Sequence, residues 1–225
     1  MAAGTSSTAL KVGLDTSTAG VFTGQANLDL ASHDSDLADI ALATGPVDLE
    51  AQVNNYAHGS LDKTGGAGSL FGSGMAWTLD FGTVTQSAGD LLADLGMVND
   101  AVGPADDLSA VLDPSNPALP SFLALDGFDA LSDIAAGDAD LLSVALDPSA
   151  LGFFDVFVTL DLSGSNASGY DQDLADEPFL TLELTGNIVA AAPPPTPEPG
   201  TLSLFGTVAS GLAFVRRRRQ KKSRA

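Results

Sequence analysis

Carboxylates in a repeated six-residue motif are the residues of this sequence whose spacing comes nearest to a binding site. The motif D-x-D-L-A-D occurs at residues 34–39 and again at residues 171–176. Ca²⁺ prefers hard oxygen ligands supplied by a loop, so both copies are candidate calcium sites. Neither copy has the glycine and the distal glutamate of an EF-hand loop, and a solvated acidic loop is the simpler interpretation. The candidate ligands are Asp34, Asp36 and Asp39 in the first copy and Asp171, Asp173 and Asp176 in the second.

Other residues suited to catalysis do not form a recognisable arrangement. His33 and His58 lie apart in the sequence, and neither accompanies a nucleophile motif, so a Ser-His-Asp triad or a histidine metal pair has no support. The chain has no cysteine, which excludes disulfides, thiolate zinc sites and cysteine nucleophiles. We therefore expect a protein that is not an enzyme and that needs no cofactor, apart from calcium at the motifs above.

Aromatic residues offer a second kind of site, because exposed rings stack on sugars in carbohydrate-binding sandwiches. The candidates are Trp77, Tyr56 and Tyr170. Trp77 alternates with Leu79 and Phe81, which favours core packing for this residue. The sequence Asn-Ala-Ser at residues 166–168 fits a glycosylation sequon, but we interpret it first as a turn.

The charge of the chain is divided sharply between its two ends. Residues 1–192 hold 28 acidic residues against Lys11 and Lys63, a net charge of −26, whereas seven of the nine basic residues lie between Arg216 and Arg224. Nucleic-acid affinity comes mostly from lysine and arginine on phosphates, so nucleic acid is excluded as a partner of the acidic body. Disorder is also disfavoured, because 44% of the residues are hydrophobic and many alternate regularly.

An internal repeat organises the acidic body. Residues 12–30 and 144–162 align without a gap and share nine of nineteen positions, and residues 47–53 resemble residues 182–188. A period near 130 residues suits a whole small domain. The chain is therefore expected to hold one full repeat and the closing part of another. We also expect an upstream segment with the missing half and a signal peptide, because residues 1–12 have no basic and apolar leader pattern.

The repeats have the period-two pattern of half-buried strands. Phe154, Val156, Val158, Leu160 and Leu162 are expected to face inward, and so are Phe22, Gly24, Ala26, Leu28 and Leu30 in the first copy, Leu180, Leu182 and Leu184, and Met75, Trp77, Leu79 and Phe81. Frequent turn signals separate these runs, which predicts an antiparallel sandwich. Residues 87–101 are predicted as the next strand of a meander rather than a short helix. Residues 122–142 fit a strand or a short helix equally.

The C-terminal stretch has the composition of a membrane anchor. A proline-rich segment precedes an uncharged run at residues 201–215, and a basic cluster headed by Arg216, Arg217, Arg218 and Arg219 follows. Fifteen helical residues span about 22 Å, less than the roughly 30 Å core of a bilayer, but flanking arginines can snorkel to the interface. Basic residues stay on the cytoplasmic side, so the acidic body would lie outside. A buried core helix with a basic tail and a tail anchor with a cytoplasmic body are the alternatives.

The order of these parts, Pro197-Glu198-Pro199, apolar run, arginine cluster and chain end, resembles the PEP-CTERM sorting signal. The resemblance implies that exosortase, a membrane enzyme similar to cysteine transpeptidases, recognises the three residues and cuts nearby. It further implies delivery from a membrane-anchored precursor to the surface or the extracellular polysaccharide of a Gram-negative bacterium. Members of that group carry a signal peptide, a pattern from which the start of this sequence departs.

Residues 60–190 resemble the Ig-like β-sandwich repeats, called choice-of-anchor domains, of bacterial surface proteins. The stretches that carry this resemblance begin "LDFGTVTQSAG" and "ALDPSALGFFDVFVTLDL". We expect a mainly β chain with an antiparallel Ig-like β-sandwich and a noncatalytic structural or adhesive role, or else calcium-assisted polysaccharide binding. The expected parts are 1–58, the end of a first repeat; 59–190, a complete repeat; 191–200, a proline-rich linker; 201–215, a transmembrane helix; and 216–225, a basic tail.

Overall fold

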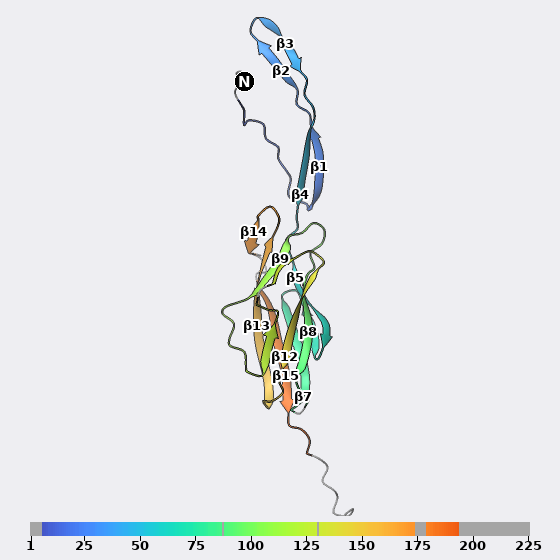
Figure 1. Ribbon diagram of the computed structural model, residues 1–225, viewed down its shortest axis with the longest axis vertical. Coiled ribbons are helices and arrows are strands. Elements are labelled where there is room, and N and C mark those ends of the chain that lie inside the picture. Colours follow the sequence, from blue (N-terminus) through green and yellow to red (C-terminus); the bar gives the residue numbers. More distant parts are fainter. Residues whose placement is uncertain (1–5, 87, 130, 174–178, 194–225) are drawn as a thin grey trace, which may run out of the picture. The chain divides into compact units, whose positions relative to one another are not determined.

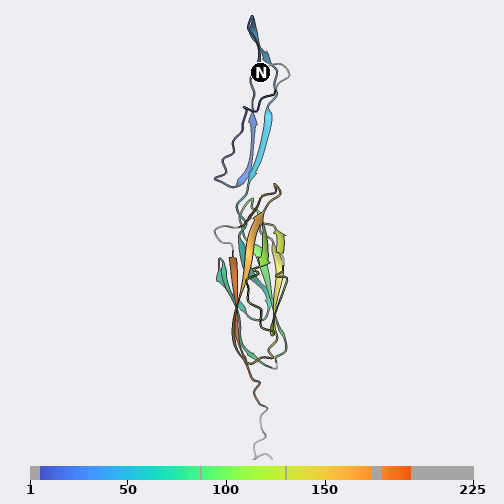
Figure 2. The same cartoon turned by 90° about the vertical axis from the view of Figure 1, so that its left-hand side faces the viewer.

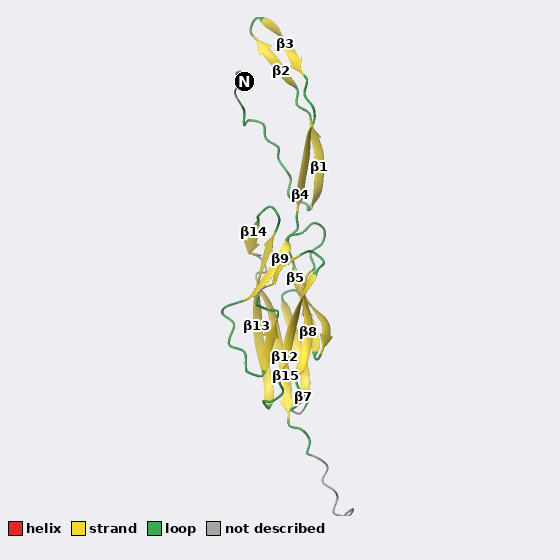
Figure 3. Cartoon of the chain, viewed as in Figure 1, coloured by secondary structure: helices red, strands yellow, loops and turns green. Residues whose placement is uncertain are grey.

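The structure is a computed structural model that describes residues 6–86, 88–129, 131–173 and 179–193. Within these residues every regular element is a strand, and none is a helix (Figure 3). This confirms the prediction of a mainly β chain. No helix long and apolar enough to cross a bilayer occurs in the described part. The expected linker from residue 194 onward, the transmembrane run and the basic tail lie outside the described residues.

The strands fall into two groups along the chain (Figure 1). The first group comprises β1 (Gly20–Ala26), β2 (Leu30–Asp34), β3 (Leu37–Leu42) and β4 (Val47–Val53). The second group comprises β5 (Gly59–Gly66), β6 (Ser69–Ser73), β7 (Ala76–Thr85), β8 (Leu91–Asn99), β9 (Asp107–Leu112), β10 (Leu123–Asp126), β11 (Leu131–Ile134), β12 (Ala139–Leu146), β13 (Gly152–Ser165), β14 (Asp171–Asp173) and β15 (Phe179–Val189).

The second group forms two sheets that enclose one core, and both can be followed in Figures 1 and 2. One sheet has the order β10-β12-β8-β5, and the other has the order β11-β9-β13-β15-β7-β6 with β14 beside β13. The core joins side chains of both sheets, such as Leu95 and Val144 from the first with Leu160 and Leu182 from the second, all fully buried. Burial of so many leucine and valine side chains is the main force that holds the two layers together.

The predicted alternation is confirmed in the two longest strands. In β13, four of the five residues predicted inward are buried, namely Phe154, Val158, Leu160 and Leu162. The fifth, Val156, is half-buried against the core. Leu180, Leu182 and Leu184 of β15 are buried in the same way. Of the four residues predicted inward at and just before β7, Leu79 and Phe81 are buried, whereas Trp77 and Met75, the residue before the strand, are half-buried beside the core.

Three sequence predictions about connections are corrected by the structure. Residues 91–99 are a strand as expected, but β8 pairs with β5 and β12 in the opposite sheet, so the meander from β7 to β8 is wrong. β7 pairs with β15 on one edge and with β6 along residues 76–80 of the other, and β8 lies in the opposite sheet. The pairing of β7 with β15 is parallel, so this sheet is mixed. The regular elements among the described residues between 122 and 142 are strands, so the short-helix alternative is wrong there.

The first group forms two separate antiparallel pairs, β1 with β4 and β2 with β3. The β1–β4 pair repeats the register of β13 with β15. Gly20 pairs with Val53 and Phe22 with Ala51, just as Gly152 pairs with Ile188 and Phe154 with Gly186. Its predicted inward face is nevertheless more exposed, since Phe22 is 39% exposed whereas Phe154 is 6% exposed.

Candidate functional site

The first D-x-D-L-A-D motif forms the turn and second strand of the β2–β3 hairpin. Asp34 ends β2, and its Oδ1 accepts a hydrogen bond of 2.9 Å from the backbone N–H of Asp36. Asp39 lies on β3, where its Oδ1 is 2.6 Å from Nδ1 of His33. Two of the three carboxylates therefore have contacts within the hairpin, one in the turn and one with a histidine.

The second motif takes a different place. Residues Asp171–Asp173 form β14, whose backbone pairs with β13, and Asp176 lies outside the described residues. In the described part of the chain, no three His, Asp or Glu side chains are grouped to hold a metal ion. The side chains of Asp171, Asp173 and Asp176 lie outside the described part of the structure. Calcium binding by the six aspartates of the two motifs therefore stays a prediction.

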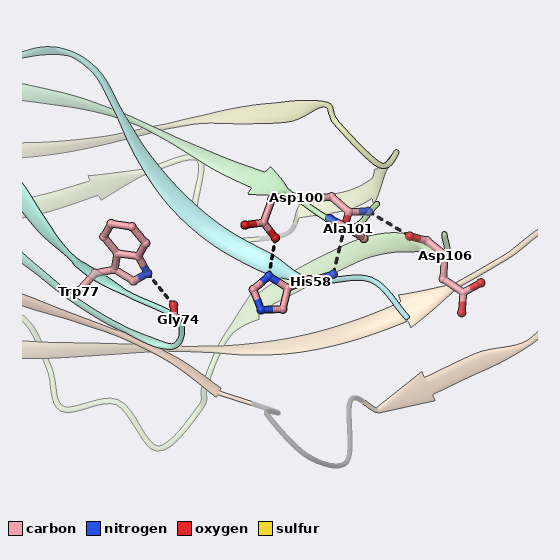
Figure 4. Close-up of polar contacts among 7 residues, drawn as sticks. His58, Gly74, Trp77, Asp100, Ala101 and Asp106 are labelled. Atoms are coloured by element: carbon pink, nitrogen blue, oxygen red, sulfur yellow. Dashed lines mark hydrogen bonds and ion pairs between the residues drawn. The ribbon is translucent and has the colours of Figure 1, made fainter. Parts of the chain in front are cut away.

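The aromatic candidates lie apart from one another in the sequence. Trp77 is half-buried against the core, and its Nε1 donates a hydrogen bond of 2.8 Å to the carbonyl oxygen of Gly74 (Figure 4). That contact occupies the polar atom of the indole, in agreement with the predicted packing role. Tyr56 and Tyr170 are exposed, Tyr56 before β5 and Tyr170 before β14. The structure does not place the three rings on one strand or one turn.

Asn99 forms the most buried polar site of the sandwich and is 0% exposed. Its Nδ2 donates to the carbonyl oxygens of Asp106 and Ile134, each at 2.9 Å, and its Oδ1 accepts from the backbone N–H groups of His58 and Ala101. The imidazole of His58 contacts the carboxylate of Asp100 (Figure 4). All four bonds are to backbone groups at or near the ends of strands in both sheets, β5 and β8 in one and β9 and β11 in the other. Asn99 therefore has a structural role.

Two further amides bind the carboxylate of Asp106, whose carbonyl group accepts from Asn99. Oδ1 of Asp106 accepts hydrogen bonds from Nδ2 of Asn54 at 2.8 Å and from Nδ2 of Asn166 at 2.9 Å. Asn166 also accepts from the backbone N–H of Ser168, so residues 166–168 form the predicted turn. Asp106 is buried, and these two amide donors compensate part of the cost of burying its carboxylate.

The outer face of the larger sheet carries aromatic residues that the sequence interpretation did not single out. Phe153 and Phe157 of β13 are 71% and 52% exposed, and Phe71 of β6 is 55% exposed. Backbone pairing places Phe157, Glu183, Thr78 and Phe71 in one row across β13, β15, β7 and β6. The signal was present in β13, where phenylalanine occupies outward positions on both sides of Asp155.

Carboxyl groups lie between these rings. Oγ1 of Thr78 donates a hydrogen bond of 2.8 Å to Oε2 of Glu183. Desolvation raises the pKa of Asp155 above its ordinary value, and the neighbouring charge of Glu183 and a hydrogen bond with it add to the increase. The face thus combines exposed rings with carboxyl and hydroxyl groups that can bind a ligand through hydrogen bonds.

The predicted sorting residues Pro197, Glu198 and Pro199 and the cluster Arg216 to Arg219 lie outside the described residues. A comparison with protein families matches residues 195–219 to the PEP-CTERM protein-sorting motif, a range that includes all seven. The chain carries a PEP-CTERM sorting motif. This motif implies an exported protein that exosortase processes and a membrane-anchored precursor that is sorted to the cell surface. The match covers the end of the chain and not the body.

Two solved structures are similar to the body at low identity. The ASH/PapD-like domain 7 of human CEP192 is 11% identical, with a TM-score of 0.36, and the alignment covers 60% of this chain and 88% of that domain. WR4, a member of the MSP family of C. elegans, is 13% identical with a TM-score of 0.29 and coverages of 51% and 92%. Among curated proteins, no relative matches the sequence.

Proposed function

We propose that this chain is a noncatalytic structural or adhesive protein of a bacterial cell surface or extracellular matrix. The single observation that carries the proposal is the sorting motif at residues 195–219, which follows an acidic body whose regular elements, where it is described, are all strands. In this proposal residues 59–190 are an Ig-like sandwich of the choice-of-anchor kind, and residues 1–58 are the end of an earlier repeat. Residues 191–200 are the tether, residues 201–215 cross the membrane, and residues 216–225 stay in the cytoplasm before processing.

The charge distribution supports this orientation. Arginine and lysine near the end of a membrane-crossing segment favour the cytoplasmic side, so the body with its net charge of −26 (28 acidic residues and two lysines) is exported. After cleavage near Pro197 to Pro199, the mature protein keeps the acidic body and loses the basic cluster. A soluble, strongly acidic protein repels copies of itself and other acidic surfaces, which suits a component of a hydrated matrix.

Expression in a Gram-negative bacterium with and without its exosortase tests this proposal. The complete gene product, tagged inside the acidic body, is expected in the medium or on the cell surface only when exosortase is present. Replacement of Pro197, Glu198 and Pro199 by alanine should retain the protein in the membrane, whereas the matched variant Pro193→Ala in the same tether should be released normally. Equal release with and without exosortase would contradict the proposal.

Polysaccharide binding is the second candidate function, and the exposed phenylalanines of the larger sheet favour it. Calcium would assist such binding if the D-x-D-L-A-D loops hold the ion. Removal of all six motif aspartates would then weaken the binding in the same way as a chelator. If calcium changes the melting temperature of this variant as it changes that of the parent protein, neither motif is a calcium site.

A further inference from the structure

We propose that the outer face of the seven-stranded sheet, centred on Phe153, Phe157 and Phe71, is a binding surface for a neutral polysaccharide. The inference rests on the proposed surface function and specifies its ligand and its site. Hereafter this surface is called the phenylalanine face. It comprises Phe71, Phe153, Phe157 and Phe179, together with Thr78, Asp155, Thr159, Asp161, Thr181 and Glu183, which lie between them on neighbouring strands.

The distribution of phenylalanine in the sandwich is uneven. Phe81, Phe128 and Phe154 are buried in the core, and Phe122 is half-buried beside it. The four exposed phenylalanines in the described part of the sandwich all lie on strands of the larger sheet, each next to a residue that is buried or half-buried against the core: Leu70, Phe154, Val158 or Leu180. Single exposed apolar residues are common on protein surfaces, but several on one sheet face indicate an interaction site.

The spacing of the rings favours an extended ligand. Phe153 and Phe157 are four residues apart on β13, a separation of about 13 Å at 3.3 Å per residue. Phe157 and Phe71 are separated by three strand spacings, or about 14 Å. A single sugar ring does not reach two such side chains, whereas an oligosaccharide lying across the sheet does. Each ring offers an apolar surface on which the C–H face of a sugar can stack.

The polar groups between the rings match the hydroxyl groups of sugars. Asp155 lies between Phe153 and Phe157 on β13. Glu183 of β15 lies beside Phe157, in the row that leads to Phe71, and Thr78 already donates to it. Carboxylate oxygens accept hydrogen bonds from hydroxyl groups, and charged acceptors form stronger bonds than neutral ones. These groups interrupt the apolar area, so the surface is less suited to a continuous apolar protein interface than to a ligand with hydroxyl groups at short intervals.

Charge selects a neutral polymer over an anionic one. Lys63 is the only lysine or arginine of the described sandwich, and it lies on β5 in the other sheet. An anionic polysaccharide or a nucleic acid would meet Asp155, Asp161 and Glu183 with no cation to offset them. A neutral polymer experiences no such repulsion.

Retention by immobilised polysaccharides tests the site, with the full chain purified in detergent micelles. The probes are a neutral β-glucan, a neutral galactomannan and, as the anionic comparison, alginate. At least one neutral polymer is expected to bind, and the double variant Phe153→Ala/Phe157→Ala should bind it at least tenfold more weakly. Phe157→Tyr keeps an aromatic ring and should retain most of the binding.

Leu141→Ala is the matched control, because Leu141 is an exposed apolar residue on β12 that borders a hollow with Asp94 and Asp126 in the four-stranded sheet. It should bind as the parent protein does. The fluorescence of Trp77, the one tryptophan of the chain, reports whether each variant is folded. Only variants with the parent spectrum are compared, and Phe157→Ala alone replaces the double variant if the latter does not fold.

Five outcomes of the binding experiment would overturn the inference. These are no retention by either neutral polymer, equal retention of the alanine variant, an equal loss in Leu141→Ala, equal retention by alginate, and loss of binding in a chelator, which would place the site at the aspartate loops. Self-association that the phenylalanine variants abolish, without polysaccharide binding, would assign the face to a second copy and also overturn it. Normal processing and release of a protein that fails to bind would leave the proposed function intact.

Discussion

The β1–β4 pair and the β13–β15 pair have related sequences and the same register, but they differ in what covers them. Phe22 faces Ala51 in the first pair, and Phe154 faces Gly186 in the second. Phe154 contacts the rings of Phe81 and Phe122, with centroid distances of 6.4 and 5.5 Å. The comparison shows that pairing register follows from the strands themselves, whereas burial requires an opposing sheet.

The edges of the two pairs differ as well. β15 has β7 beside it in parallel, and the C-terminal part of β13 has β9 beside it. In the described residues, β4 and β1 pair only with each other. Two-stranded ribbons have little independent stability in water, whereas additional strands and an apolar layer stabilise the same pairing. We therefore expect the two pairs to respond very differently to matched substitutions.

The largest difference is expected for the two equivalent phenylalanines. Phe154→Ala removes a buried ring from the core and should lower the free energy of unfolding of the sandwich by about 3–5 kcal/mol. Phe22→Ala removes a partly exposed ring that lies outside the sandwich core, and it should change the free energy of unfolding of the sandwich by about 0.5 kcal/mol or less. Urea denaturation followed by Trp77 fluorescence measures both. Similar losses in the two variants would show that the first pair is covered as the second is.

A smaller difference is expected at the residues that face these rings. A Cβ atom added at Gly186 would lie 2.8 Å from Cζ and 2.9 Å from Cε1 of Phe154, whose ring is held by its core neighbours. Gly186→Ala should therefore destabilise the sandwich by about 1–3 kcal/mol through overpacking. The first repeat already has alanine at this position, and Ala51→Gly should leave the urea midpoint of the sandwich unchanged. A stable Gly186→Ala variant would mean that the Phe154 ring moves freely.

The smallest effect is expected from Asp155, whose counterpart in the first repeat is Thr23. The folded-state pKa of Asp155 is raised, chiefly by desolvation and then by Glu183, so folding favours the protonated form. Its contribution to stability is full below the unfolded pKa near 3.8 and is lost as the pH rises through the folded value. Asp155→Asn should remove this loss, so the stability of the variant relative to the parent protein should increase as the pH rises from 3 to 7.

Asp113 supplies a control, because its pKa is shifted in the opposite direction to that of Asp155. The backbone N–H of Ser115 donates to its carboxylate, and this bond lowers the pKa of Asp113. Its contribution to stability is present above the unfolded pKa and is lost as the pH falls through the folded value. The stability of Asp113→Asn relative to the parent protein should therefore fall as the pH rises. Thermal melting from pH 3 to 7 measures both variants, and a common sign would contradict the assignment.

Strand positions and facing could be predicted from the sequence because they depend on local alternation. Leu180, Leu182 and Leu184 and the inward residues of β13 follow that pattern closely. Strand partners could not be predicted in the same way, because period-two alternation does not specify which strand lies alongside. The predicted meander from β7 to β8 was wrong for this reason, since β7 pairs with β15 and β6 instead.

The sites divide in a similar manner. The sorting motif is a linear signal, so Pro197, Glu198 and Pro199 could be identified without a fold. The phenylalanine face depends on four strands in register, and Phe71 reaches the row of Phe157 only through two intervening strands. The two D-x-D-L-A-D motifs have similar sequences but differ in secondary structure, because residues 34–36 end a strand and enter a turn while residues 171–173 form a strand.

The intact mass of the mature protein, isolated from cells that contain exosortase, tests the central claim of an exported and processed surface protein most directly. The predicted result is a chain that ends near Pro197 to Pro199 and lacks Arg216 to Arg219. The same protein from cells without exosortase should retain the full C-terminus in the membrane fraction. A mature protein that keeps the arginine cluster in both strains would contradict the account.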